Sequence, residues 1–422
     1  PGEAKVGLHL MNAMQNFWTM RGYFFEGRER SAALLFHPDT REPTTTRAKA
    51  LNGAGFLAIR QGDYSSARSL YEEALETYRV LGNRLGMARS LSNLGLLANH
   101  QGDYATARAL YEESLTIKRE MGDKRGIAYS LNGLGLIASN QGDYAAARSL
   151  YEESLALWRE FGDKASIAGS LLNLGVLHYC QHDYASARTL YEEGLALWRE
   201  MGNKGGIAMS LINLGVVTYE QGDNASARAL YEESLVLWRE MGDKGGEARA
   251  LQNLGDLARR EGDLTTAHAL LQQSLTIKRA LEDRAGISCT LISLGKAAQH
   301  EGDPALARSY YHEALTLRRE MGDRAGLFEA LEVCADFAAQ EGHTERAAQL
   351  WGAAERLLDS IGSVMPPRER ARRDARVAET RQRSGEAAFS AAWSAGRALS
   401  LEQAVALAQI AISETEQSGS PA

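Results

Sequence analysis

The chain has 422 residues, of which 44% are hydrophobic and 24% charged, so we expect a folded core along most of its length. Its 47 Lys and Arg face 54 Asp and Glu, and the net charge of −7 excludes a general basic field for nucleic acid. Three scattered cysteines and the lack of a long apolar run exclude a disulfide framework and a membrane span, and we expect a cytoplasmic protein. The chain begins at Pro1, and we expect it to be part of a longer protein.

A 40-residue period organises most of the chain. Residues 1–46 predict a degenerate N-terminal helical repeat, because Met11, Gly22 and Phe24 fall in the register of the copies that follow. Residues 47–366 hold eight copies, and a leucine recurs at the same place in each: Leu51, Leu91, Leu131, Leu171, Leu211, Leu251, Leu291 and Leu331. Such self-similarity predicts stacked supersecondary units that bury a continuous core.

Each copy predicts two helices. In the second copy, Leu94 and Ala98 lie one turn apart on one helical face. Gly102 then suits the left-handed residue that ends a helix, and Asp103 suits the N-cap of the next. The first helix of a copy carries Gly95, and such a small residue lets two helices approach closely. No sustained alternation of apolar and polar residues predicts a strand.

The pattern resembles the tetratricopeptide repeat. In the second copy the resemblance lies in Leu94, Gly95, Ala98, Ala107, Tyr111 and Ser114. It implies an all-α fold, a right-handed superhelical solenoid of helix-turn-helix repeats. The copies are longer than the usual repeat and lack its closing proline, and in this they look like the arrays of kinesin light chains and spindle-orientation adaptors.

After Pro366 and Pro367 the period ends, and residues 367–422 predict a helical C-terminal cap with a disordered tail from about Glu414. Ser400 is a candidate N-cap in this segment. We interpret the arginine-rich stretch 368–383 as a solvated helix, because it lacks the interleaved aromatic residues of a nucleic-acid site.

Both ends of the chain are similar to parts of bacterial signal-transduction ATPases and LuxR-type activators. The C-terminal resemblance lies in AAQLWGAAERLL and in GEAAFSAAWSAGRALSLEQAV, and the N-terminal one in Asn16-Phe17-Trp18 and Glu26-Gly27-Arg28. This resemblance implies that an upstream nucleotide-binding domain precedes the repeats in the full-length protein. The repeats would then form its ligand-sensing arm.

No motif predicts a catalytic residue, a cofactor or a metal. The strings 202–206 and 242–246 lack the span and the Lys-Ser/Thr ending of a phosphate-binding loop. His178, Cys180 and His182 are the densest set of metal-ligand types, but no further ligand is near in sequence, and His182 replaces a helix-ending glycine. We therefore expect no enzyme activity.

Two periodic patterns have structural interpretations. Arg68 and Glu72, and their counterparts in the next copies, are spaced for i, i+4 ion pairs on a solvated face. Large aromatic residues at one position of three copies are expected to fill the core between repeats. They are Trp158, Trp198 and Trp238.

Positions that change between copies indicate the ligand surface, because packing positions must stay constant. By analogy with tetratricopeptide arrays, the first helix of each copy lines the concave groove. The candidate ligand-binding residues there are Leu172, Asn173, Val176, Tyr179, Met209, Ile212, Asn213, Val216, Tyr219, Arg249, Asn253, Asp256 and Arg259. The three asparagines can bond the backbone of an extended peptide. Two alternatives stay open: the apolar members pack between repeats, and each asparagine bonds a neighbouring helix.

We therefore expect a non-enzymatic repeat domain that binds a protein or an extended peptide, with no direct nucleic-acid or membrane partner. The expected host is a bacterial signalling ATPase or transcriptional regulator. One alternative is a free-standing scaffold or adaptor that assembles a complex. Another is an accessory or catalytic unit of an enzyme, and the C-terminal segment is the only part of the sequence left unexplained that could serve that role.

Overall fold

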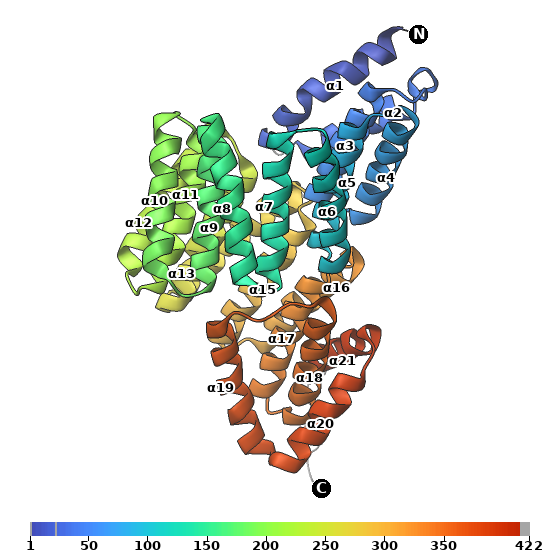
Figure 1. Ribbon diagram of the computed structural model, residues 1–422. Helices are drawn as coiled ribbons and strands as arrows, with labels where there is room; N and C mark the ends of the chain where they lie inside the picture. Colours follow the sequence, from blue (N-terminus) through green and yellow to red (C-terminus); the bar gives the residue numbers. More distant parts are fainter. Residues whose placement is uncertain (1, 22, 414–422) are drawn as a thin grey trace.

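The computed structural model describes residues 2–21 and 23–413, and every regular element in these residues is a helix (Figure 1). Sixteen helices form eight consecutive hairpins. Their first helices are α3 (Thr45–Arg60), α5 (Arg84–His100), α7 (Lys124–Asn140), α9 (Lys164–Cys180), α11 (Lys204–Glu220), α13 (Lys244–Glu261), α15 (Arg284–Glu301) and α17 (Arg324–Gln340). The second helices are α4 (Tyr64–Val80), α6 (Tyr104–Glu120), α8 (Tyr144–Phe161), α10 (Tyr184–Glu200), α12 (Asn224–Met241), α14 (Leu264–Ala280), α16 (Pro304–Met321) and α18 (Thr344–Ile361). The predicted all-α superhelical solenoid is confirmed.

Local signals set the helix boundaries as predicted. Gly102 adopts φ +73° after the end of α5, a conformation that costs other residues more than glycine. The Asp103 carboxylate then accepts a hydrogen bond from the Thr106 backbone N–H at 3.2 Å and caps α6. The same arrangement, an aspartate or asparagine that accepts from the amide three residues on, starts most helices of the array.

Small residues bring the two helices of a hairpin together. A Cβ at Gly95 would lie 2.7 Å from the Tyr111 ring, so the ring occupies the place that a side chain would take. Large aromatic residues fill the space between hairpins, because Trp158 is 1% exposed and Trp238 is 6% exposed. The expectation that the three tryptophans belong to the core between repeats is confirmed for Trp158 and Trp238, whereas Trp198 is half-buried.

The arginines of the second helices join successive repeats, and the predicted i, i+4 pairs with glutamate do not form within the described residues. Arg108 Nη2 donates to Gln141 Oε1 at 2.8 Å, and Arg308 Nη2 lies 2.8 Å from Glu341 Oε2. Both acceptors lie 33 residues further on, at the turn inside the next hairpin. Both arginines therefore bond to the next repeat and not to a glutamate on their own helix, so the prediction of local pairs was wrong.

The first helices form the concave inner layer of the superhelix. Successive first helices contact one another, as α3 does α5, α5 does α7 and α13 does α15. The prediction that first helices line the groove therefore agrees with the packing.

The superhelix also closes on itself, because early turns contact late ones. Gln61 Nε2 donates to Glu282 Oε2 at 2.9 Å across 221 residues. The Arg324 backbone N–H donates to the Gln101 carbonyl at 3.2 Å, and Ser363 Oγ donates to the Asn140 carbonyl at 2.6 Å. Three successive hairpins thus touch the hairpins one superhelical turn later, and Figure 1 shows α15 and α16 beside α5–α7.

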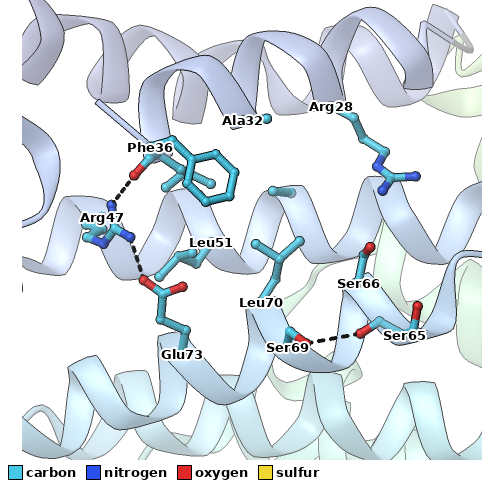
Figure 2. Close-up of a pocket in the computed structure, with 12 residues that line it drawn as sticks. Arg28, Ala32, Phe36, Arg47, Leu51, Ser65, Ser66, Ser69, Leu70 and Glu73 are labelled. Atoms are coloured by element: carbon cyan, nitrogen blue, oxygen red, sulfur yellow. Dashed lines mark hydrogen bonds and ion pairs between the residues drawn. The ribbon is translucent and has the colours of Figure 1, made fainter. Parts of the chain in front are cut away.

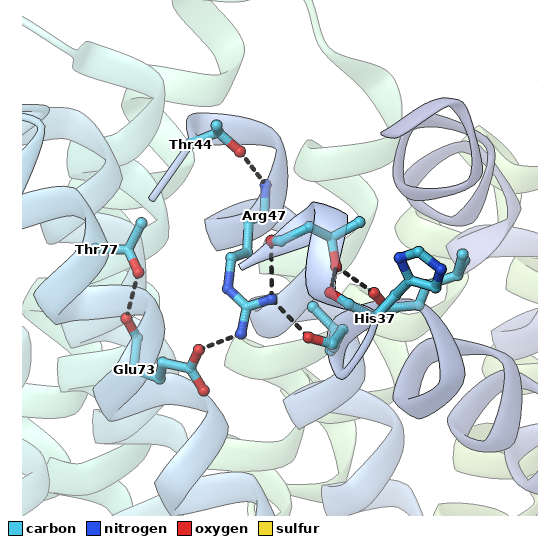
Figure 3. A network of polar contacts seen from close by, with 8 residues as sticks. His37, Thr44, Arg47, Glu73 and Thr77 are labelled. Carbon is cyan, nitrogen blue, oxygen red and sulfur yellow. Dashed lines mark hydrogen bonds and ion pairs between the residues drawn. The ribbon is translucent and has the colours of Figure 1, made fainter. Parts of the chain in front are cut away.

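Two helices and a short 3₁₀ turn precede the hairpins: α1 (Gly2–Arg21), α2 (Phe24–Leu35) and η1 (Pro38–Thr40). Arg47 of α3 connects them to the array (Figure 3). Its guanidinium donates to the carbonyls of Leu35 and Thr40 at 2.7 and 3.1 Å and lies 2.5 Å from Glu73 Oε1 on α4. Because Arg47 is 9% exposed, this network fixes the end of α2 against the first hairpin.

The C-terminal helices are α19 (Pro367–Ser384), α20 (Glu386–Ala398) and α21 (Leu401–Ser413). Helix α20 packs closely on α18, since a Cβ at Gly396 would lie 1.9 Å from the Gln349 carbonyl oxygen. Ser400 caps α21 as predicted, by accepting from the Gln403 N–H at 3.2 Å. The tail predicted from Glu414 lies outside the described residues.

Candidate ligand groove

Six of the predicted ligand residues line one cavity of about 240 Å³ on the concave face. They come from three successive first helices, α9, α11 and α13. They are Tyr179, Val216, Tyr219, Asn253, Asp256 and Arg259. The two tyrosines are half-buried, so part of each side chain is exposed to solvent.

A larger cavity of about 610 Å³ continues this groove toward the C-terminal cap. It shares Tyr219 and Arg259 with the first cavity and extends over α15, α17 and α19. Its lining carries charges of both signs, with arginines and Lys296 facing carboxylates. The groove therefore has an aromatic end in the central repeats and a charged end beneath α19.

The charged residues near the tyrosines hold one another in place. Arg260 lies 4.5 Å above the centre of the Tyr219 ring, and its Nη1 is 3.8 Å from Glu220 Oε1. Asp256 accepts a hydrogen bond from Ser293 Oγ at 3.0 Å, and its other oxygen lies 3.5 Å from Arg259 Nη2. These contacts orient the side chains that a ligand would meet.

Lys296 projects into the interior of the superhelix. Its side chain is exposed to solvent, yet the surrounding helices bury it enough to lower its pKa, against the opposing effect of Asp256. Both statements hold because Lys296 lies in a channel that water can enter but that protein surrounds. No ion pair to Lys296 forms within the described residues, so its charge is available to an acidic ligand group.

Helix α19 closes the charged end of the groove. Arg373 is 7% exposed, with its Nε 3.0 Å from Glu332 Oε1, and Arg376 Nε is 2.7 Å from Asp336 Oδ1. Burial raises the pKa of Glu332 to about 7 although Arg373 opposes the rise. The interpretation of this stretch as a solvated helix was wrong for Arg373, because two acidic residues of α17 draw the arginines onto the array.

The other predicted ligand residues lie outside the two cavities. Val176 is 38% exposed and Arg249 is exposed, with Arg249 Nη1 3.2 Å from Met209 Sδ. Leu172 and Met209 are half-buried against the core. Ile212 is 4% exposed and belongs to that core, so it presents no surface to a ligand.

The asparagine row is half-buried along α9, α11 and α13. Asn173, Asn213 and Asn253 form no side-chain hydrogen bond to a neighbouring helix in the part of the chain that the structure describes. Of the three, Asn253 lines the cavity.

Sequence reasoning left out Glu220 and the arginines of α19 as groove residues. The 40-residue period places Lys296 at the position of Val216 and Asp256, and Lys296 lines both cavities. The α19 residues lie outside the period, and only the folded cap brings them to the groove.

The remaining chemical motifs have structural roles. His182 adopts φ +64°, and its Nδ1 lies 3.0 Å from the Tyr184 hydroxyl, while His178 Nδ1 lies 3.0 Å from Asp183 Oδ2. No group of three or more metal-ligating side chains occurs among the described residues. In the string 202–206, Asn203 caps α11 by accepting from the Gly206 N–H at 2.9 Å. None of the described helices is long and apolar enough to cross a membrane.

A separate cavity of about 390 Å³ lies between α2 and α4 (Figure 2). Residues of α3 also line it. Leu51 and Leu70 form its floor, and the arginines at its ends are paired, Arg28 with Asp63 at 2.6 Å and Arg47 with Glu73. The cavity therefore offers apolar surface but no free charge to select a ligand.

The fold and the groove define an α-helical repeat protein with a concave ligand surface. Profiles of the tetratricopeptide repeat match residues 46–120, 126–200, 206–280 and 290–325, more than half of the chain. The chain belongs to the tetratricopeptide repeat family. None of the curated protein sequences matches it.

Several solved structures are similar. A Rap protein complexed with Competence and Sporulation Factor has 12% identity and a TM-score of 0.60, covering 86% of this chain and 99% of that chain. The Rap conjugation gene regulator of plasmid pLS20, in complex with the Phr* peptide, has 14% identity and a TM-score of 0.53, covering 75% and 96%. BtubC from P. vanneervenii has 24% identity and a TM-score of 0.41, covering 53% and 91%. At these identities the likeness to the two Rap proteins establishes the superhelical fold.

Proposed function

We propose that the chain is a non-enzymatic module that binds an extended peptide along its concave face. The observation that carries the proposal is the cavity in which Tyr179, Val216 and Tyr219 meet Asp256 and Arg259 from the next repeat. Apolar side chains of the peptide would lie on the tyrosines, and its charged side chains would reach the mixed charges beyond. Aromatic surface beside a polar rim is typical of binding hot spots.

The asparagine row supports an extended ligand. A side-chain amide donates and accepts hydrogen bonds as a peptide backbone does. Asn173, Asn213 and Asn253 recur every 40 residues on successive first helices, and their amides make no hydrogen bond to a neighbouring helix in the described residues. A peptide that runs along the groove can therefore bond them in turn.

The structural comparison gives further support. The Rap regulator of pLS20 shares the superhelical fold, and its structure is a complex with the Phr* peptide. A superhelix of this shape thus accommodates a peptide in at least one protein.

A random linear peptide library displayed on phage tests the proposal. The selected peptide is synthesised, and its Kd is measured by fluorescence anisotropy. Replacing both Tyr179 and Tyr219 with Ala should weaken binding by about 2 kcal/mol, roughly 30-fold. Lys296→Gln changes an exposed side chain and should also weaken a peptide that carries acidic residues. Glu113→Ala on the exposed surface of α6 is the control and should leave Kd unchanged.

Two results would contradict the proposal. One is a library that yields no specific peptide. The other is a selected peptide whose Kd is unaffected by both the tyrosine variant and Lys296→Gln while circular dichroism shows an intact fold.

The resemblance of both ends to bacterial regulators supports a further proposal about the host. We infer that the chain is the ligand-sensing arm of a cytoplasmic signalling ATPase or LuxR-type transcriptional regulator. The reading frame upstream of Pro1 tests this: a phosphate-binding loop of the form GxxxxGK[ST] is expected there. A reading frame without a nucleotide-binding domain would favour a free-standing scaffold instead.

A further inference from the structure

A buried lysine without an acidic partner lies on the concave side of the early repeats. Lys118 of α6 is 3% exposed, and its Nζ donates to Ser92 Oγ at 2.9 Å and to Ser130 Oγ at 2.8 Å. No carboxylate lies within ion-pair distance of Nζ in the described residues. Burial lowers the pKa of Lys118 to about 8. Asp123 opposes this lowering but forms no ion pair with Nζ, so the charge of the buried ammonium group is only partly compensated.

The cavity around Lys118 gathers two more cations. It has a volume of about 530 Å³, and its lining includes the exposed side chains of Arg89 and Arg125. The Arg125 guanidinium also lies 5.3 Å above the Phe161 ring. The acid in the lining is Asp123, whose Oδ1 accepts from the Gly126 N–H at 3.0 Å to cap α7. Three cations therefore converge on one carboxylate.

Later repeats carry cations at the position of Lys118, with more acidic groups around them. Arg318 forms a buried ion pair with Asp323, the counterpart of Asp123. At Lys278 the Cys289 thiol and two carboxylates, Asp283 and Asp256, raise the pKa against the effect of burial, whereas among the described residues Asp123 is the one group that does so at Lys118. In that repeat Ala285 replaces Arg125, so the third cation is missing. Of these three positions, Lys118 has the largest excess of positive charge around it.

We propose that this cavity is an anion-binding subsite for a carboxylate or phosphate group, with Lys118 at its base and Arg89 and Arg125 at its rim. Charge-assisted hydrogen bonds from a lysine and two guanidinium groups are the usual means of holding such an oxyanion. Arg89 occupies the inner position that Arg249 occupies later in the array, so the subsite faces the same concave channel as the groove. The inference deepens the proposed function and rests on it for the molecule that carries the anion.

Calorimetric titration of the whole chain with inorganic phosphate, and separately with succinate, tests the subsite. Ionic strength is kept constant with chloride, because exposed charges are screened by salt. We expect saturable binding of at least one anion, weakened about tenfold or more by Lys118→Met and by Arg125→Gln. Lys118→Arg should retain binding. The position accepts Trp158 and Arg318 in other repeats, so both changes at Lys118 can be accommodated. Lys278→Met is the matched control and should bind as the parent does.

Phosphate binding alone would identify the ligand group as a phosphate, and succinate binding alone would identify it as a carboxylate. If neither anion binds, or if Lys118→Met and Arg125→Gln bind as tightly as the parent, the proposal is overturned. The titration contains no peptide, so its failure leaves the tyrosine groove untouched. Conversely, a failed peptide selection leaves a positive anion result standing.

Discussion

Two glycine-to-alanine substitutions in neighbouring repeats should have opposite effects on stability. A Cβ added at Gly215 in α11 would lie 2.4 Å from Cε1 of Tyr231, and the ring is 4% exposed within the core. The ring has no free volume into which to move, so the helices must separate. Overpacking of this kind costs about 1–3 kcal/mol. At Gly169 in α9, no atom lies within 4 Å of an added Cβ. Alanine there should stabilise the helix by about 0.5–1 kcal/mol.

Urea unfolding followed by circular dichroism measures both changes as shifts of the transition midpoint. Gly215→Ala should lower the midpoint and Gly169→Ala should raise it. A double variant, Gly215→Ala with Tyr231→Leu, should lose less stability than the two single changes added together, because the smaller side chain removes the clash. The sixth repeat already pairs Gly255 with Leu271 at the equivalent positions. If Gly215→Ala leaves the midpoint unchanged, the close contact with the ring does not limit helix packing, and the reasoning fails.

Three further predictions follow from buried or paired groups. Burial by itself would raise the pKa of Asp63, but hydrogen bonds from Ser66 and Arg28 lower it to about 2. The ionised carboxylate therefore adds to the free energy of unfolding above pH 3.8, its ordinary pKa, and this contribution should be lost as pH falls through 2. Asp63→Asn should flatten this loss in urea unfolding measured at each pH, and an unchanged acid profile would contradict it. Burial lowers the pKa of Lys118 from its ordinary value of 10.5 to about 8, so the unfolded chain binds more protons between these values, and stability should rise with pH there. Burial also lowers the pKa of Lys278 and Lys296, so Lys118→Met should reduce the rise rather than remove it, and an unreduced rise would assign it to those two lysines. Met321 is 4% exposed and packs with Ile59 and Tyr64 of the first hairpin. Met321→Ala should therefore lower the free energy of unfolding by about 2–5 kcal/mol and speed hydrogen exchange in α3 and α4. If exchange changes only near α16, the contact between the distant hairpins does not stabilise the first one.

Features that repeat locally could be predicted from the sequence. Gly102 and Asp103 act within one turn of the chain, and Gly95 meets Tyr111 within one hairpin, so the pattern of a single copy contains both partners. The position of the groove on the first helices followed from the same pattern. Six of the predicted residues lie together because they occupy three positions of the repeat, each three residues from the next along the first helix.

Features that depend on helix rotation or on long-range packing could not be predicted. Ile212 and Val216 are one turn apart, yet Ile212 is buried while Val216 lines the cavity, since a small rotation of α11 decides between them. Arg108 has Glu112 one turn away but reaches Gln141 of the next repeat instead. Arg373 meets Glu332 only after α19 folds back onto α17, and no period relates those residues.

The closure of the superhelix limits how the number of repeats can change. In an open array each repeat contacts its neighbours alone, so copies can be added or lost without disturbing distant ones. Here Gln61, Gln101 and Asn140 each contact a residue more than 200 positions later, and those contacts depend on how many copies lie between. Deleting or duplicating one 40-residue copy between α7 and α15 would move all three partners out of register at once. The tandem copies that arise so easily by gene duplication are therefore held to a fixed number by the geometry of the turn they complete.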